Sequence, residues 1–352
     1  MTRTDLLLRA ALVVSTFAAA PALAGPRWDF DDGANLQFSL LGQFHAVTVA
    51  DAVADRDLYL RRGRLIFSGQ IADGVKVFAE TDNDNAGNAA VSSVSTDLQD
   101  IFVDLRLRGD HWLEVGLILL PLSFENTSSA ASLLGLDYNA EVIKLANTFV
   151  WRDQGLMLHG ACGGKFAYRA GVFDGYEVGT TKNPEAAPRF TGHLEYAAVG
   201  AAPTGWFHGQ ERLGGDPYLL LGTGIDYQRR ANRAGYVSAA DPGWTIDSRA
   251  FVVDLQSGFV AGGMFGTLDA GWYDWDNLNF HGSTWFVESG LRRDRVQLTG
   301  KFAAVEPGVG DAIRNLTAGL HYYRLKHKLR YGVEFSTGDS PNQLLAGVQF
   351  LL

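Results

Sequence analysis

Runs in which polar and apolar residues alternate one by one recur along most of the chain. In the run that starts at Lys328, Leu329, Tyr331 and Val333 alternate with Arg330. A period of two is that of a β-strand, because successive side chains of a strand point to opposite faces of the sheet. We therefore predict an all-β chain of about sixteen strands. The runs span residues 35–49, 58–71, 74–81, 98–108, 111–120, 154–161, 165–173, 188–199, 217–229, 246–257, 260–274, 281–291, 294–305, 313–323, 327–336 and 343–352.

The charged residues keep to one face of the runs. After Asp294, Val296 and Leu298 share one face while Arg295 and Gln297 share the other. An Arg or Lys that faces lipid at mid-membrane costs roughly 2 to 4 kcal/mol, so a strand that spans a bilayer needs this sorting. A soluble barrel would reverse the faces, but some sixteen strands enclose a lumen too wide for side chains to fill. We predict a 16-stranded antiparallel transmembrane β-barrel.

The connections between the runs alternate between short and long. Asp73-Gly74 and Gly109-Asp110 can form tight turns, with glycine where a positive φ is needed. With the short turns in the periplasm, as in bacterial barrels, nearly every long connection is extracellular. The exception is the stretch 200–216, a long connection on the side of the short turns.

The longest connection, residues 121–153, begins at Pro121, where an alternating run stops. Long loops without regular structure are uncommon in compact domains and are usually functional. A strand, a long insert and another strand form the pattern of a barrel that folds one loop into its lumen. We predict that this third extracellular loop constricts the pore, with Glu125, Lys144 and Arg152 among its polar groups. A plain surface loop is the alternative.

The first residues have the order of a secretory signal peptide. Two arginines precede an apolar stretch, and the small residues around Ala22 and Ala24 suit signal peptidase. We predict cleavage after Ala24, which makes 1–24 the signal peptide and 25–352 the outer-membrane barrel. An ordinary buried helix is the alternative.

Composition excludes several kinds of site. The formal net charge of -9 argues against nucleic acid as a partner, because phosphate binding needs clustered cations. Cys162 is the single cysteine, so disulfides, thiolate metal sites and c-type haem are excluded within the chain. The 8 histidines show no metal-ligand spacing. We therefore predict no metal and no cofactor.

The alternation predicts that most strand cations point into the lumen. Acidic residues on the same faces oppose them, among them Asp104, Glu114 and Glu288. Rings of Arg and Lys favour anions, and a low-dielectric wall strengthens their field. The alternative is that these charges pair across the lumen as structural ladders and leave a weakly selective pore. The predicted pore-lining cations are Arg62, Arg64, Arg106, Arg108, Lys165, Arg169, Arg189, Arg295, Lys301 and Arg330.

Four fragments of the chain, Arg61–Leu65, Val115–Gly116, Arg152–Gly155 and Gly171–Gly175, follow one another at characteristic spacing. In this order they resemble the phosphate-selective porin O/P family. The resemblance implies a sixteen-stranded outer-membrane barrel, usually trimeric, whose inward arginines and lysines favour anions. Where the family commonly has a lysine in the strand before the pore loop, this chain has Leu119.

The function that we predict is passive diffusion across the outer membrane of a Gram-negative bacterium, with a preference for small anions such as phosphate. The expected partners are small anionic or polar solutes, outer-membrane lipid and further copies of the chain in a homotrimer. One alternative is a weakly selective, cation-tolerant or structural barrel that partners another envelope component. The other is a barrel enzyme. The chain has no G-x-S-x-G nucleophile elbow, and we predict that it is not an enzyme.

Overall fold

The structure, a computed structural model, describes residues 25–30, 33–50, 56–88, 95–139, 151–175, 187–234, 244–277 and 280–352. Lys144 and the predicted signal peptide lie outside these ranges, so both stay predictions.

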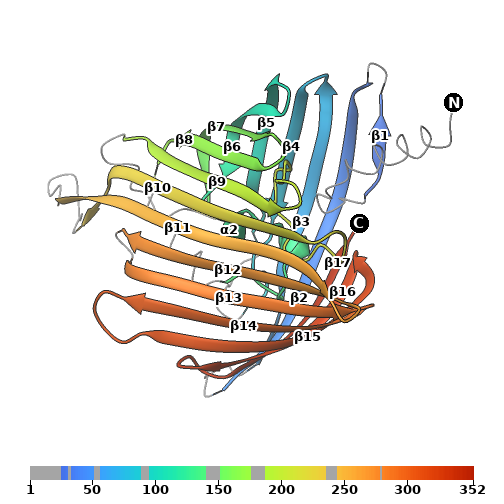
Figure 1. The fold of residues 1–352 in the computed structure, drawn as a ribbon, viewed down its shortest axis with the longest axis vertical. Helices are drawn as coiled ribbons and strands as arrows, with labels where there is room; N and C mark the ends of the chain where they lie inside the picture. Colours follow the sequence, from blue (N-terminus) through green and yellow to red (C-terminus); the bar gives the residue numbers. More distant parts are fainter. Residues whose placement is uncertain are drawn as a thin grey trace.

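Sixteen strands, β2 to β17, follow one another around a closed antiparallel sheet (Figure 1). Each strand pairs with the next in sequence, and β17 pairs with β2 from Gln343 opposite Val49 to Leu351 opposite Leu41, which closes the ring. Each predicted run corresponds to one of these strands, and the predicted fold class is confirmed. The strands are β2 (Asn35–Val49), β3 (Arg56–Ala72), β4 (Val75–Asp82), β5 (Asp97–Arg108), β6 (His111–Leu119), β7 (Arg152–Cys162), β8 (Phe166–Phe173), β9 (Arg189–Val199), β10 (Tyr218–Ala234), β11 (Trp244–Ala261), β12 (Met264–Asp276), β13 (His281–Arg293), β14 (Val296–Pro307), β15 (Ile313–His327), β16 (Leu329–Gly338) and β17 (Gln343–Leu351).

A further short strand, β1 (Arg27–Asp29), pairs with the part of β2 that lies beyond its pairing with the C-terminal end of the chain. Leu352 exchanges backbone hydrogen bonds with Leu40 of β2, and a few residues further along β2, Phe38 donates its N–H to the carbonyl of Pro26. β1 then pairs antiparallel with β2. Sequence reasoning missed β1, because three residues are too few to show alternation.

The faces of the strands are sorted as a bilayer requires. On β11, Val253 is 49% exposed, whereas the next residue, Asp254, is 4% exposed. On β16, Val333 and Phe335 are exposed while Arg330 is buried. Apolar side chains therefore cover the outside of the barrel and polar ones its inside, the reverse of a soluble protein core.

The two ends of the barrel differ in their connections. At one end the connections between β3 and β4 and between β5 and β6 are tight turns, in which Gly74 (φ 71°) and Gly109 (φ 56°) adopt the left-handed conformation that favours glycine. Except for residues 200–216, between β9 and β10, the long connections join the strands at the other end. The rule for outer-membrane barrels places the short-turn end in the periplasm.

Two short helical elements, α2 (Phe124–Thr127) and the 3-10 turn η2 (Ala130–Ser132), lie between β6 and β7. None of the helices among the described residues is long and apolar enough to cross a membrane.

The sorting of the faces predicts the effect of a charge on each side of β15. Leu320 is half-exposed on the outward face, so Leu320→Lys should lower the free energy of unfolding by about 2 to 4 kcal/mol. Urea titration of the protein in lipid vesicles measures this loss. Thr317→Lys, whose position faces inward beside Ser336, is the matched control and should cost much less. Equal losses for the two variants would contradict the assignment of the faces.

Candidate functional site

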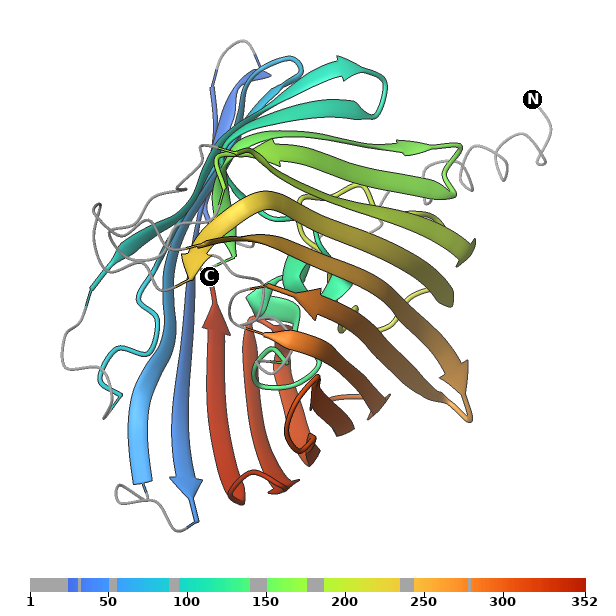
Figure 2. The ribbon, with the colours of Figure 1, turned by 90° about the vertical axis from the view of Figure 1, so that its left-hand side faces the viewer.

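The connection between β6 and β7 folds into the barrel. Its described part, residues 120–139, is called the loop insert below. The Phe124 N–H donates to Asp254 on β11 (2.6 Å), and the Ala130 carbonyl accepts from Gln43 on β2 (2.8 Å). These two strands lie on opposite sides of the ring, so the loop insert crosses the lumen. Figure 2 shows its helical turns inside the strands.

A capping box starts α2. The Asn126 N–H donates to Ser123 Oγ (3.2 Å), and the Ser123 N–H donates to Asn126 Oδ1 (2.7 Å). These bonds satisfy N–H groups that the first turn of a helix leaves unpaired. The polar backbone of the loop insert can therefore lie buried in the lumen without losing hydrogen bonds.

Two wall arginines hold the loop insert in place. Arg330 on β16 donates to the carbonyls of Leu133 (2.5 Å) and Gly135 (2.9 Å). Arg62 on β3 donates to the carboxylate of Asp137 (2.6 Å). A planar guanidinium with five N–H groups can bind two such acceptors at once. Both arginines face the lumen, and both are engaged by the loop insert.

A β-bulge turns a third arginine inward. The pairing of β2 with β3 slips by one residue between Arg62 and Leu60, which leaves Arg61 as the extra residue. A bulge re-aims side chains, and Arg61 Nε donates to Asp137 (2.5 Å). Burial alone would raise the pKa of the Asp137 carboxyl, but Arg62 and Arg61 hold it well below its usual range. Strict alternation assigns Arg61 to the lipid face, so sequence reasoning missed it.

The connection between β9 and β10, residues 200–216, enters the barrel from the opposite end and is called the turn insert below. Arg169 on β8 donates to the carbonyls of Gly205 (2.7 Å) and Trp206 (2.8 Å). The length of this connection on the short-turn side was the one signal in the sequence for such a segment. Its path into the lumen was not predicted.

The two inserts meet inside the barrel. Ser128 and His208 form a parallel β-bridge, and the His208 N–H donates to the Thr127 carbonyl (3.0 Å). Gln210 of the turn insert donates to Glu125 of the loop insert (2.5 Å). Burial raises the pKa of the Glu125 carboxyl, even though this carboxylate accepts hydrogen bonds such as the one from Gln210. Each insert therefore supplies part of the other's hydrogen bonding.

An apolar cluster packs parts of both inserts against strands β2 to β8 and β17. Tyr138 of the loop insert and Trp206 and Phe207 of the turn insert pack against inward apolar side chains. The Trp206 ring stands edge-on to Phe78, with centroids 5.3 Å apart. A cavity of about 80 Å³ remains between them. The wall members of the cluster are Leu41, Ile66, Phe78, Phe102, Ile118, Met157, Phe173 and Leu351.

Three further predicted cations form ion pairs along the wall. Their partners are inward carboxylates of the same sheet, and all of these side chains are buried. Arg152 is the first residue of β7, so it belongs to the wall and not to the loop in which it was predicted. The pairs are Arg64 with Glu80 (2.7 Å) and Asp82 (2.8 Å), Arg152 with Asp100 (2.9 Å), and Arg189 with Asp226 (2.6 Å).

The remaining predicted cations lie near the barrel ends or are half-buried. Arg106, Arg108, Lys165 and Arg295 are exposed at the short-turn end, where Arg106 pairs with Asp73 and Lys165 donates to the Gly200 carbonyl (2.9 Å). The structure therefore places these four at the rim and not along the middle of the lumen, because their strands end there. Lys301 is half-buried on β14, opposite Glu288 in register.

Carboxylates outnumber arginines among the buried side chains that the structure describes. Most are ion-paired or hydrogen-bonded, but both carboxylate oxygens of Asp269 are buried without a hydrogen-bond partner in the described chain. The buried carboxylates are the thirteen residues Glu80, Asp82, Asp100, Asp104, Glu114, Glu125, Glu195, Glu211, Asp226, Asp254, Asp269, Glu288 and Glu334. The buried arginines are the six residues Arg62, Arg64, Arg152, Arg169, Arg189 and Arg330.

One lumen cavity concentrates the arginines. It measures about 200 Å³ and lies toward the long-loop end, between β3, the start of β7 and the loop insert. Arg61, Arg62, Arg64 and Arg152 line it together with acidic and aromatic residues.

Part of the chain matches a known family model. Residues 38–209 match the family model described as phosphate-selective porin O and P. No curated protein matches the sequence.

Solved porin structures share the fold. OmpF of Salmonella typhi in complex with daunomycin is 12% identical, with a TM-score of 0.65 over 92% of this chain and 99% of that one. OmpT of Vibrio cholerae in its trimer form is 11% identical, with a TM-score of 0.58 over 91% and 99%. A Rh. blastica porin mutant is 12% identical, with a TM-score of 0.59 over 90% and 100%. At this identity the likeness concerns the fold.

The contact between the loop insert and β10 requires a glycine and predicts what its loss would do. A Cβ on Gly224 would lie 1.9 Å from the carbonyl oxygen of Leu122, so Gly224→Ala must displace the loop insert. We expect the free energy of unfolding to fall by about 1 to 3 kcal/mol, as overpacking does, and the single-channel conductance to change. Urea titration and planar-bilayer recordings measure the two effects. Gly300→Ala, with no atom within 4 Å of the new Cβ, is the control. Identical behaviour of the two variants would contradict this packing.

Proposed function

We propose that this chain, as a porin of the Gram-negative outer membrane, is a weakly selective diffusion channel with a slight preference for small cations. The premise that it is a porin comes from the shared fold and from the match of residues 38–209 to the phosphate-selective porin O and P model. The family and the fold point to a channel rather than an enzyme.

The balance of charge in the lumen carries this proposal. The thirteen buried carboxylates exceed the six buried arginines, and the arginines are engaged by carboxylates or by insert carbonyls. Rings of carboxylates favour cations, and a low-dielectric wall focuses their field. An unpaired carboxylate about 8 Å from a monovalent cation stabilises it by about 0.5 kcal/mol in a water-like medium, which is a preference of about twofold. The selectivity should therefore be modest.

The two inserts support passage of small solutes only. They meet through hydrogen bonds in the lumen and pack against the wall, and the loop insert crosses from β2 to β11. A solute must pass beside them, so we propose that the loop insert, with Glu125 facing the turn insert, narrows the pore as its sequence suggested.

A preference for small anions such as phosphate is the second candidate. Two observations favour it. The family model is described as phosphate-selective, and four arginines line the cavity of about 200 Å³ toward the long-loop end. Guanidinium groups bind phosphate oxygens in a bidentate fashion. In this chain the same arginines also contact Asp137, Glu80, Asp82 and Asp100, which reduces their field.

We also propose that three copies assemble in the membrane. OmpT of Vibrio cholerae, which shares the fold, is described in a trimer form. The exposed apolar side chains on the outer face of the strands can contact both lipid and neighbouring copies of the chain.

The two candidates predict opposite signs of one measured potential. In a planar bilayer with a KCl gradient, the purified porin should give a small reversal potential in favour of potassium. Glu334→Gln removes an inward carboxylate of β16, which lies 3.3 Å from His321, and should move this potential toward zero. Asp311→Asn, in an exposed loop, is the control and should leave it unchanged. A reversal potential in favour of chloride would reject the cation proposal and support the anion candidate.

A further inference from the structure

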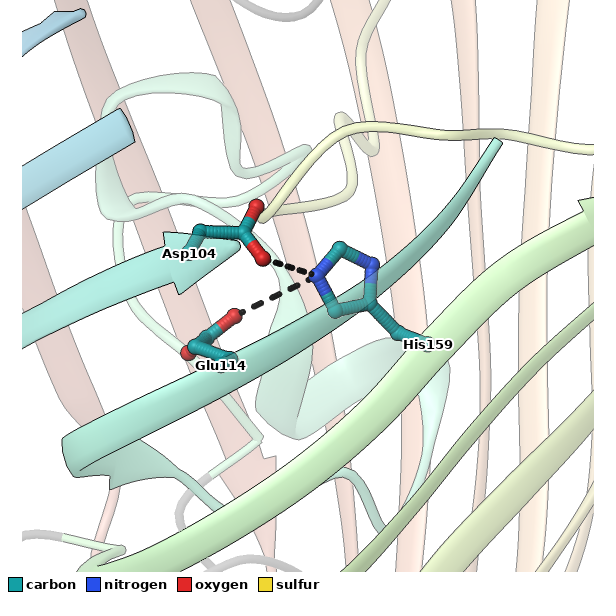
Figure 3. A group of neighbouring side chains, drawn as sticks. All are labelled: Asp104, Glu114 and His159. Carbon is teal, nitrogen blue, oxygen red and sulfur yellow. Dashed lines mark hydrogen bonds and ion pairs between the residues drawn. The ribbon is translucent and has the colours of Figure 1, made fainter. Parts of the chain in front are cut away.

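Three potential metal ligands meet on the inner wall near the short-turn end. Asp104 comes from β5, Glu114 from β6 and His159 from β7, and their ligand atoms all lie within 4.8 Å of one another. His159 Nε2 is 3.0 Å from an Asp104 oxygen and 3.7 Å from a Glu114 oxygen. In Figure 3 both carboxylates point at this nitrogen. The three residues are 1%, 3% and 5% exposed, respectively.

The register of the sheet brings these residues together. Asp104 is directly opposite Glu114 in the pairing of β5 with β6. Glu114 is opposite Met157 on β7, and His159 lies two residues further along on the same face. The cluster is therefore a fixed product of three neighbouring strands and needs no rearrangement to assemble. A site on paired strands is held more rigidly than one on a loop.

The hydrogen bonding of the cluster is incomplete. Asp104 uses its second oxygen to accept from Trp206 Nε1 of the turn insert (2.9 Å). The Glu114 carboxylate lies 3.7 Å from His159 Nε2, beyond hydrogen-bond distance. This carboxylate is buried and points at the other two ligand groups.

The neighbouring cations are engaged elsewhere. Lys76 is opposite Asp104 in register, but its ammonium lies over the Trp112 ring, 3.9 Å from the centroid. Arg169 is opposite His159, but it donates to the turn insert and lies 3.5 Å from Glu195. Neither cation forms an ion pair with Asp104 or Glu114 in the described chain, so both carboxylates remain available to a divalent cation.

The spacing fits a bound transition ion. Bonds of about 2.0 to 2.2 Å to nitrogen and oxygen place the ligand atoms of a tetrahedral site roughly 3.3 to 3.6 Å apart. The two measured spacings, 3.0 and 3.7 Å, bracket this range. One imidazole with two carboxylates suits a first-row divalent ion better than calcium or magnesium, which prefer oxygen ligands. Trp206 would orient the Asp104 ligand, as outer-shell partners do at metal sites.

We propose that Asp104, Glu114 and His159 bind one divalent transition-metal ion of the Zn²⁺ class inside the lumen. Through Trp206 the ion links the wall of β5 to β7 with the turn insert. Asp104 and Glu114 also belong to the buried carboxylates counted above, but the test of this site measures metal binding and not conduction, so the two proposals can fail separately.

The test is calorimetric titration of the full-length porin in detergent, after removal of metal with EDTA. We expect one Zn²⁺ per chain and no saturable binding of Mg²⁺. Co²⁺ at the same site should show visible d–d absorption bands of the metal ion bound by imidazole and carboxylates. Absence of Zn²⁺ binding overturns the proposal.

Variants locate the ion. Glu114→Gln and His159→Gln should each weaken Zn²⁺ binding by more than about 100-fold, because they remove a ligand, whereas Trp206→Phe should weaken it by about 10- to 100-fold. His45→Gln, at a buried inward histidine for which no ion pair is found in the described chain, is the matched control and should bind as the parent does. Heat-dependent gel mobility checks that each barrel is folded. Glu114→Gln is isosteric, so it keeps the test valid if His159→Gln does not fold. Unchanged affinity in Glu114→Gln overturns the assignment.

Discussion

The free-energy cost of placing a charge against hydrocarbon determines which side chains of this molecule face outward and which face the lumen. Each strand of the ring touches lipid on one face, so its charged side chains must occupy the other. On β16 this puts Arg330 and Glu334 inside and Val333 outside. The barrel closes through β17 and β2, so no sheet edge within the ring is left unpaired in the membrane. An antiparallel ring is the arrangement that satisfies both the side chains and the backbone.

The same sorting creates a second demand inside the ring. Thirteen buried carboxylates and six buried arginines share the lumen with apolar side chains that no lipid covers. The arginines pair with carboxylates or bind insert carbonyls, and the apolar patch around Phe78 packs against Tyr138 and Trp206. The inserts therefore supply hydrogen-bond and packing partners to the wall, and the wall supplies such partners to the inserts. In the channel that we propose, selectivity depends on the charges that remain after this pairing.

Alternation along the chain was sufficient to place all sixteen strands of the ring, because each strand repeats the same local pattern many times. It failed where a local irregularity changes the phase. The bulge at Arg61 turns a side chain inward that strict alternation assigns to lipid, and the rim positions of Lys165 and Arg295 depend on where strands end. The cluster of Asp104, Glu114 and His159 had no signal in sequence spacing, because its members are joined by register across three strands.

By itself the sequence determined the fold class, the number of strands in the ring and which faces meet lipid, since each follows from a period of two within about ten residues. Tertiary structure decided how the lumen is filled. Its contacts join residues far apart in the chain. Examples are the hydrogen bond from His208 to Thr127, the hydrogen bonds from Arg330 to the loop insert, and the ion pairs of the charged side chains. Such contacts depend on register and on the paths of the two inserts, and no local pattern encodes either.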